Sequence, residues 1–445
     1  MKGFTTMITR TSKYLALAGV FLAGCSAAPE GGDIGDTEDE FSSPNSTLVD
    51  FDFDGSLVTD SSFGNGENEI NDQMLYTMGH LNTDRSVGRL DKLTITNVKK
   101  TDLADGKVGV TYHAKLPVAW AGKTRLPSSY KLTLPKDVSF DGQEAFTTKY
   151  SHACVDFGAH DVDSGSMWYY YRPRNSGCKL DAADVVSVTA SVARSTENTT
   201  GKFPEYQKVW EDNQLNVVAI FGKFEDGKTT ESDAGVSGYN QFIRAVQSEF
   251  RNLPTVTTPA RLPAALGVSA PDVTFSVTLA DGKKVNITAL LVDNISQTDA
   301  KFDRRYESLS TKADIIAYNG HAGLGQNVRA LGRKGKFEAK QYVIVFMNGC
   351  DTFSYVDGSL AQTRARLNPD DPTGTKYMEF VTNAMPSFFH SMPNASLSLV
   401  RGLMKTNAPL TYDQIFKSVD TSQMVLVTGE EDNAFRPGMT IGTTP

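Results

Sequence analysis

Two side chains suited to nucleophilic and acid–base chemistry each follow a short apolar run of the sequence. Cys350 comes after YVIVFM (342–347) and an Asn-Gly pair, and His321 comes after DIIAY (314–318) and another Asn-Gly pair. Such runs predict buried strands, and Asn-Gly readily ends a strand. If the two strands are parallel neighbours, both side chains emerge at the edge of the sheet where ligands bind in open α/β folds.

The two residues predict a thiol nucleophile assisted by an imidazole. A cysteine attacks carbonyl groups as the thiolate, and a nearby histidine supplies the base that produces it. Glycines at positions 320, 323, 325 and 349 allow tight turns that bring backbone N–H groups close to a bound carbonyl. The alternative interpretation is a packed apolar cysteine and a histidine in an ordinary turn.

Residues 213–430 resemble the caspase-like clan of cysteine peptidases, most sharply at IIAYNGHAG and VIVFMNGCDT. In that clan one apolar strand ends in His-Gly and a second ends in Ala-Cys or a similar pair. The resemblance implies that His321 is the general base or acid and that Cys350 is the nucleophile, which forms a thioester. It also implies an oxyanion hole made by backbone amides near Ala322, Gly323 and Cys350, and it requires no cofactor.

Two positions depart from the pattern of the clan. Ala322 stands where the clan has glycine, and Gly349 stands where it has alanine or serine. These departures leave room for a second hypothesis, a non-catalytic surface lipoprotein that binds a protein or glycan partner and keeps the peptidase-like domain as a scaffold. An enzyme needs an accessible Cys350 close to His321, whereas a scaffold does not.

The N-terminus is typical of a secretory signal, with basic residues before the apolar stretch LALAGVFLA (15–23). LAGC, which ends at Cys25, resembles the lipobox of bacterial lipoproteins. The resemblance implies that residues 1–24 are a signal peptide and that Cys25 carries the lipid anchor. Ser26, in place of an aspartate, implies the outer membrane within the cell envelope. Residues 25–47 are small and acidic, which predicts a disordered tether.

The remaining cysteines are Cys154, Cys178 and Cys350. Export favours disulfides, so Cys154 and Cys178 are predicted to pair. Cys350 is then left alone, and an unpaired cysteine in an exported protein is either reactive or deeply buried.

The apolar pattern changes along the chain. Residues 48–196 alternate between apolar and polar, as in YKLTLP (130–135), without a helical period of useful length, which predicts a β-sandwich. Residues 197–213 break the pattern and are the predicted linker. Residues 214–445 combine continuous apolar runs with helical spacing, which predicts a caspase-like α/β domain with a mainly parallel sheet covered on both faces.

No metal ion, nucleotide or nucleic acid is expected as a ligand. DFDFDG (50–55) matches the start of a calcium loop, but its twelfth position is Ser61 where a glutamate is needed. GHAGLG (320–325) lacks the G-x-G-x-x-G spacing, and no histidines show H-E-x-x-H spacing. A formal net charge of −8 argues against nucleic acid. The sequence therefore predicts a cell-envelope cysteine endopeptidase that acts on a protein or peptide substrate.

Overall fold

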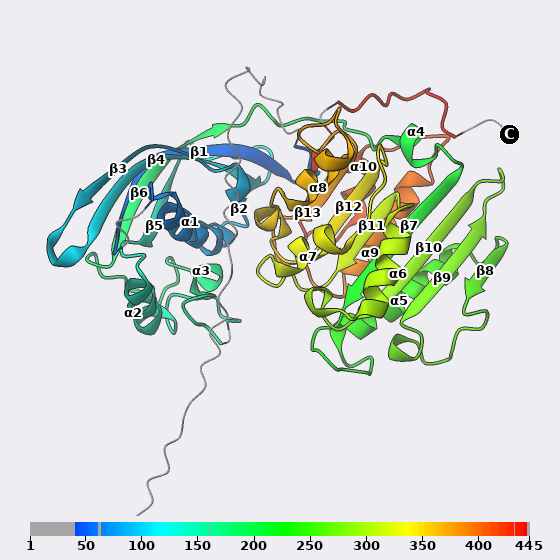
Figure 1. Ribbon diagram of the computed structural model, residues 1–445, viewed down its shortest axis with the longest axis horizontal. Helices are drawn as coiled ribbons and strands as arrows, with labels where there is room; N and C mark the ends of the chain where they lie inside the picture. The colour runs from blue at the N-terminus through cyan, green and yellow to red at the C-terminus, as the bar shows by residue number, and fades with distance from the viewer. Residues whose placement is uncertain (1–40, 61–63, 160, 431, 443–445) are drawn as a thin grey trace, which may run out of the picture. The chain divides into compact units, whose positions relative to one another are not determined.

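The computed structural model describes residues 41–60, 64–159, 161–430 and 432–442 (Figure 1). The predicted signal peptide and the predicted lipid-bearing Cys25 lie outside these residues. The predicted tether (25–47) does not extend to residue 47, because its described end is packed. Phe41 is buried, and its amide donates to the Glu197 carbonyl at 2.8 Å. Within the described ranges, no helix is both long and apolar enough to cross a membrane.

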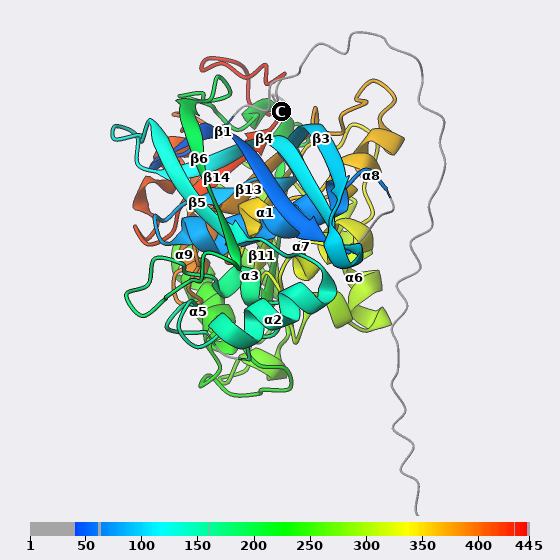
Figure 2. The same ribbon diagram turned by 90° about the vertical axis from the view of Figure 1, so that its left-hand side faces the viewer.

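The first sheet is antiparallel. Its strands are β1 (Ser46–Thr59), β2 (Val87–Gly88), β3 (Thr94–Asp102), β4 (Val108–Ala121), β5 (Ser129–Pro135) and β6 (Val185–Arg194). They lie in the order β2-β4-β1-β6-β5, with β3 also paired to β4, and Figure 2 shows most of them side by side. In β1, Phe51 and Phe53 are buried while Asp52 and Asp54 are exposed, as expected for a strand with one covered face.

The prediction of a β-sandwich is wrong, because helices take the place of a second sheet. α1 (Glu67–Asn82) contacts β1 and β5, and α2 (Phe140–Tyr150) and α3 (Met167–Tyr170) follow later in the chain. The helical period of α1 is hidden in the sequence because polar side chains such as Gln73 are buried among its apolar residues. Gln73 is tolerated there because its amide donates to the Pro135 carbonyl at 2.7 Å.

The second sheet is mixed. Its strands are β7 (Gln214–Gly222), β8 (Thr255–Thr258), β9 (Asp272–Thr278), β10 (Lys284–Val292), β11 (Ile315–Asn319), β12 (Val343–Asn348), β13 (Met378–Asn383) and β14 (Val425–Gly429). The order is β14-β13-β12-β11-β7-β10-β9-β8. The pairings from β13 to β10 are parallel, whereas β14, β9 and β8 are joined by antiparallel pairings. The predicted alternation of strands and helices is confirmed, but the antiparallel edges make the sheet mixed.

Helices cover both faces of this sheet. One face packs against α4 (Tyr206–Val209), α5 (Ala234–Glu249), α9 (Met392–Leu403) and α10 (Tyr412–Ile415), and the other against α6 (Ala300–Ser310), α7 (Gln326–Lys334) and α8 (Ser359–Leu367). In β11, Ile315 and Ala317 point into the first of these cores, and Ile316 and Tyr318 point into the second. Burial on both sides explains the continuous apolar run of this strand.

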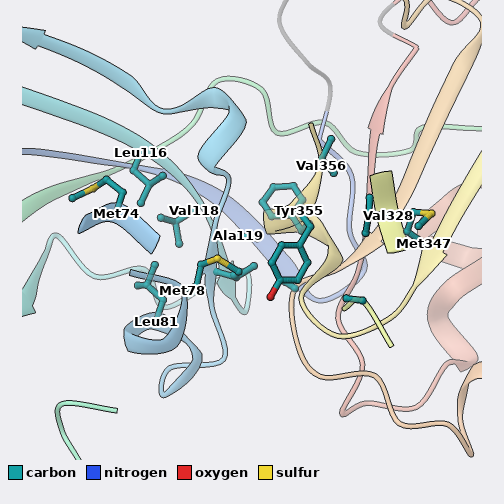
Figure 3. Close-up of a cluster of buried hydrophobic side chains, with 14 of the residues drawn as sticks. Met74, Met78, Leu81, Leu116, Val118, Ala119, Val328, Met347, Tyr355 and Val356 are labelled. Carbon is teal, nitrogen blue, oxygen red and sulfur yellow. The ribbon is translucent and has the colours of Figure 1, made fainter. Parts of the chain in front are cut away.

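The two sheets share one buried apolar cluster (Figure 3). Residues of α1 and β4 face residues of β12, α7 and the segment after β12. The labelled members are Met74, Met78, Leu81, Leu116, Val118, Ala119, Val328, Met347, Tyr355 and Val356. Across the same junction, the Ser354 hydroxyl donates to the Gly88 carbonyl at 2.7 Å. α1 and β4 of the first sheet's part of the chain therefore lie directly beside the segment that follows β12, which carries Cys350.

The predicted linker (197–213) is packed against the second sheet. Trp210 is fully buried, and its indole N–H donates to the Leu403 carbonyl at 2.9 Å. The Tyr206 hydroxyl donates to the Gly402 carbonyl at 3.0 Å. This segment is therefore part of the core that α9 covers.

Candidate functional site

His321 and Cys350 follow neighbouring parallel strands. β11 and β12 pair with Asn319 opposite Asn348, so each reactive residue lies two positions beyond a paired strand end. The two strands are therefore parallel neighbours, which is the condition under which the sequence analysis placed both residues at one edge. Both residues therefore lie at the carboxyl edge of the sheet, where ligands bind in folds of this kind.

The loops that carry His321 and Cys350 are in direct contact at Gly349. A Cβ atom at this position would lie 2.8 Å from the Gly320 carbonyl oxygen and 3.3 Å from the Ala322 amide nitrogen. A side chain at position 349 would therefore force the backbone of one loop to shift, which gives the glycine before Cys350 a steric reason. The same approach places the Ala322 amide, a predicted oxyanion donor, against the cysteine loop.

An asparagine ends each of three neighbouring strands at this edge. Asn319 ends β11, Asn348 ends β12 and Asn383 ends β13, and all three are fully buried. The Asn348 amide donates to the Asn319 side-chain oxygen at 2.8 Å, and the Asn383 amide donates to the Asn348 side-chain oxygen at 3.0 Å. We call this series the asparagine ladder. It ties together the points from which both reactive loops depart, a role that the sequence analysis missed.

His321 is exposed and oriented by a backbone carbonyl. Its Nε2 lies 3.1 Å from the Phe224 oxygen, in the loop after β7. A carbonyl only accepts hydrogen bonds, so Nε2 carries the proton and Nδ1 keeps the lone pair in the neutral ring. The imidazole also packs against the rings of Phe224 and Phe389, each with its centroid 5.1 Å away. Nδ1 is therefore the nitrogen available as a base, and its orientation is set by a group far away in the sequence.

Cys350 is partly buried, and its thiol is covered. Its sulfur donates to the Ser387 carbonyl at 3.7 Å. Burial and the neighbouring Asp351 raise the pKa of the thiol to about 11. The thiol is therefore protonated near neutral pH in this conformation. Among the described residues, no hydrogen bond joins it to His321.

Asp351 is a buried carboxyl group directly after the cysteine. It is fully buried with φ 51°, in the left-handed region, and burial raises its pKa to about 7. Its Oδ1 has no hydrogen-bond partner in the described part of the chain, while Oδ2 accepts a long bond of 3.5 Å from Asn82. The negative charge that Asp351 carries when ionised opposes the thiolate of Cys350.

A cavity of about 380 Å³ opens beside His321. It lies beyond the carboxyl ends of β7, β10 and β11 and is lined by Lys223, Phe224, Glu225, Asp226, Asp293, Asn294, Tyr318, His321 and Asn327. Three exposed apolar side chains lie on loops that follow strands of the same edge: Phe224 after β7, Leu324 after β11 and Phe388 after β13. The lining of the cavity itself is mostly polar and charged, and Phe224 is the one of these three side chains that belongs to it.

The other predicted site residues have distinct outcomes. The Cys154–Cys178 disulfide is confirmed, and Cys350 is the free cysteine of the described ranges. Gly323, with φ 59°, turns the chain after Ala322 into the turn that leads to α7. Across the described residues, no group of three His, Cys, Asp or Glu side chains is placed to hold a metal ion.

Comparison of the chain with protein-family models, with curated proteins and with solved structures finds no match. The assignment of function therefore depends on the geometry around His321 and Cys350.

Proposed function

We propose that the protein is a cysteine peptidase of the caspase-like type, with Cys350 as nucleophile and His321 as general base. The observation that carries the proposal is the orientation of His321. Its Nε2 is occupied by the Phe224 carbonyl at 3.1 Å, which leaves Nδ1 as the base. A nucleophile, a base and a group that orients the base form the arrangement that activates a thiol. The parallel pairing of β11 and β12 supports the same assignment.

The reaction follows from these roles. Nδ1 of His321 accepts the proton of the Cys350 thiol, and the thiolate attacks the carbonyl carbon of the scissile peptide bond. The carbonyl oxygen gains the negative charge and accepts hydrogen bonds from the backbone amides of Ala322, Gly323 and Cys350. The imidazolium gives its proton to the departing amine as the carbon–nitrogen bond breaks. Water, deprotonated by the same imidazole, then hydrolyses the thioester and restores the thiol.

The other expectations extend this proposal. The substrate is a protein or peptide, and neither a cofactor nor a nucleic acid takes part. The chain is held in the cell envelope by a lipid on Cys25, on the outer membrane. The first sheet with its helices lies beside the catalytic edge, as the Ser354–Gly88 hydrogen bond indicates, so it is placed to influence access to the site.

Hydrolysis of a mixed peptide library by the full chain, followed by mass spectrometry, tests the proposal. His321→Ala and Cys350→Ala are each expected to lower kcat/KM by about 10²–10⁴-fold, the range expected for an acid–base or nucleophilic group. His390→Ala removes an exposed imidazole after β13 and is expected to leave the rate unchanged. Hydrolysis that persists in Cys350→Ala would exclude a cysteine peptidase. A protein whose Cys350 is alkylated as fast as a free thiol but which hydrolyses no peptide would also exclude a cysteine peptidase.

A second candidate function is a binding scaffold without catalysis. The observation that favours it is the covered Cys350 thiol, whose pKa is raised to about 11. In a scaffold, this thiol stays bonded to the Ser387 carbonyl and reacts only after unfolding. The alkylation rate of Cys350 would then equal the global unfolding rate, and no peptide would be cleaved.

A further inference from the structure

The cavity beside His321 carries more negative than positive charge. Its charged lining consists of one lysine, Lys223, and three carboxylates, Glu225, Asp226 and Asp293. Negative groups therefore exceed positive ones by two at this place on the surface. Such a lining favours a ligand with a positive charge and repels an anion.

Lys223 is held by a carboxylate of the same lining. Its side chain is only 9% exposed, and its Nζ forms an ion pair with Asp293. Asp293 also accepts a hydrogen bond from the Gly227 amide at 3.1 Å. Because Lys223 and Asp293 neutralise each other, the excess negative charge belongs to Glu225 and Asp226.

Glu225 and Asp226 are both exposed and can take a new partner. Glu225 pairs with Lys228 at 2.8 Å, but both side chains are more than half exposed, and an ion pair of this kind contributes little. No ion pair joins Asp226 to another residue in the described ranges. A cation in the cavity therefore meets two carboxylates without breaking a strong contact of the folded chain.

The loop that carries these carboxylates also orients the proposed base. The amides of Phe224 and Glu225 donate to the Asp233 carboxylate at 3.1 Å and 2.9 Å. Asp233 in turn caps α5, since it accepts from the Val236 amide at 2.9 Å. The Phe224 carbonyl accepts the hydrogen bond from Nε2 of His321 at 3.1 Å. This wall of the cavity is therefore held in place before a ligand arrives.

The inner wall of the cavity offers a further acceptor. Asn327 lines the cavity and is 3% exposed. Its Nδ2 donates to the His321 carbonyl at 2.7 Å and to the Tyr318 hydroxyl at 3.2 Å, which fixes the orientation of the amide. Its Oδ1 has no hydrogen-bond partner in the described part of the chain. A buried acceptor without a partner is costly, so a donor brought by a ligand would relieve it.

We propose that this cavity holds a basic side chain of the substrate, arginine in preference to lysine, from a residue that flanks the scissile bond. The inference rests on the proposed peptidase function and names the substrate class of the same site. His321 itself lines the cavity, so the occupant lies beside the base that acts on that bond. The volume of about 380 Å³ suits one long side chain.

The preference follows from the donors of each side chain. The guanidinium group of arginine has five N–H donors in a planar fork and no acceptor, so it matches two carboxylates and an amide oxygen. Lysine brings the same charge with three donors on a compact group. A glutamate side chain in the cavity would place its charge beside Glu225 and Asp226 and is therefore excluded.

Hydrolysis of four internally quenched peptides by the full chain tests the proposal. The peptides differ only at the central residue, which is arginine, lysine, glutamate or citrulline, the neutral analogue of arginine. We expect cleavage beside arginine, located by mass spectrometry, with kcat/KM about tenfold above that for citrulline, as two partly exposed ion pairs provide. Glu225→Gln/Asp226→Asn is expected to lower this ratio to about one. Glu144→Gln/Glu307→Gln, which removes two exposed carboxylates on α2 and α6, is the matched control and is expected to keep it.

Binding by Cys350→Ala separates the cavity from the chemistry, because this variant cannot form a thioester. Fluorescence anisotropy with dye-labelled arginine and citrulline peptides measures the two dissociation constants. The arginine peptide is expected to bind about tenfold more tightly, and the difference is expected to vanish when Glu225→Gln and Asp226→Asn are added. Thermal unfolding establishes that each variant is folded.

The two assays distinguish the possible outcomes. Tighter binding of the arginine peptide together with cleavage beside arginine supports both proposals. Tighter binding without hydrolysis by the wild type supports the basic side chain in the cavity and overturns the peptidase. Hydrolysis without a preference for arginine over citrulline overturns the role of the cavity alone, and so does a preference that Glu225→Gln/Asp226→Asn leaves intact. The absence of both binding preference and hydrolysis overturns both proposals.

Discussion

Replacement of Asn348 by alanine tests whether the asparagine ladder fixes the edge of the sheet from which the His321 and Cys350 loops depart. The Asn348 side chain makes five hydrogen bonds, with Asn319, Asn383, Ser387, the Met392 carbonyl and Gln423. Most of these partners keep another bond; Asn319, for example, still accepts from Ser396 at 2.7 Å. Ser387 has no other hydrogen-bond partner for its hydroxyl among the described residues, and leaving it buried and unpaired costs about 1–3 kcal/mol. With a few tenths for each weakened bond, we expect a loss of about 3 kcal/mol in the free energy of unfolding.

Urea denaturation of the full chain measures this loss. The Ser387 carbonyl also accepts a hydrogen bond from the Cys350 thiol, so the alkylation rate of Cys350 is expected to change in the Asn348→Ala variant as well. Asn286→Ala is the matched control, because Asn286 lies in β10 of the same sheet and its amide bonds with Asn216 at 3.0 Å in a partly exposed network. If Asn348→Ala costs less than about 1 kcal/mol, or no more than Asn286→Ala, the ladder does not hold the edge together and the reasoning is refuted.

Three further predictions concern packing, pH and the disulfide. Gly349→Ala is expected to lower the free energy of unfolding, measured by urea denaturation, by about 1–3 kcal/mol, because its Cβ would lie 2.8 Å from the Gly320 carbonyl oxygen. Gly358→Ala is the control, since its Cβ would meet only the flexible side chain of Gln362. Equal stability of the two variants would contradict the close contact at Gly349. Burial lowers the pKa of His80 to about 4 in the folded chain, so the unfolded chain binds the proton first as the pH falls. His80 therefore contributes about 3 kcal/mol to the free energy of unfolding above pH 6.5, and this contribution is lost as the pH falls to 4. Unfolding curves of wild type and His80→Gln that stay parallel between pH 7 and 4 would refute this. The Cys154→Ser/Cys178→Ser double variant, which opens a loop with a separation of 24 residues, is expected to lose about 3 kcal/mol in the same assay, and an unchanged midpoint would show that the bridge adds no stability.

The sequence predicted well what depends on local pattern. The runs before His321 and Cys350 are strands, because side chains buried on both faces leave a continuous apolar signature. Their parallel pairing meets the condition for a shared edge, and the predicted Cys154–Cys178 bond is confirmed. The β-sandwich failed because α1 buries polar side chains, whose hydrogen bonds to strand carbonyls cannot be read from spacing.

Only the tertiary structure identified the groups that act on the two reactive residues. The orienting carbonyl of Phe224 lies 97 positions before His321, and a backbone oxygen has no signature in the sequence at all. The Ser387 carbonyl, which accepts a hydrogen bond from the Cys350 thiol, lies 37 positions after it in the loop that follows β13. The sequence by itself identified a thiol and an imidazole as the candidate pair and a buried strand before each of them, because strand periodicity and strand-ending residues are local. The folded chain decided that the base is oriented and the thiol is covered, because those contacts join segments that no local pattern relates.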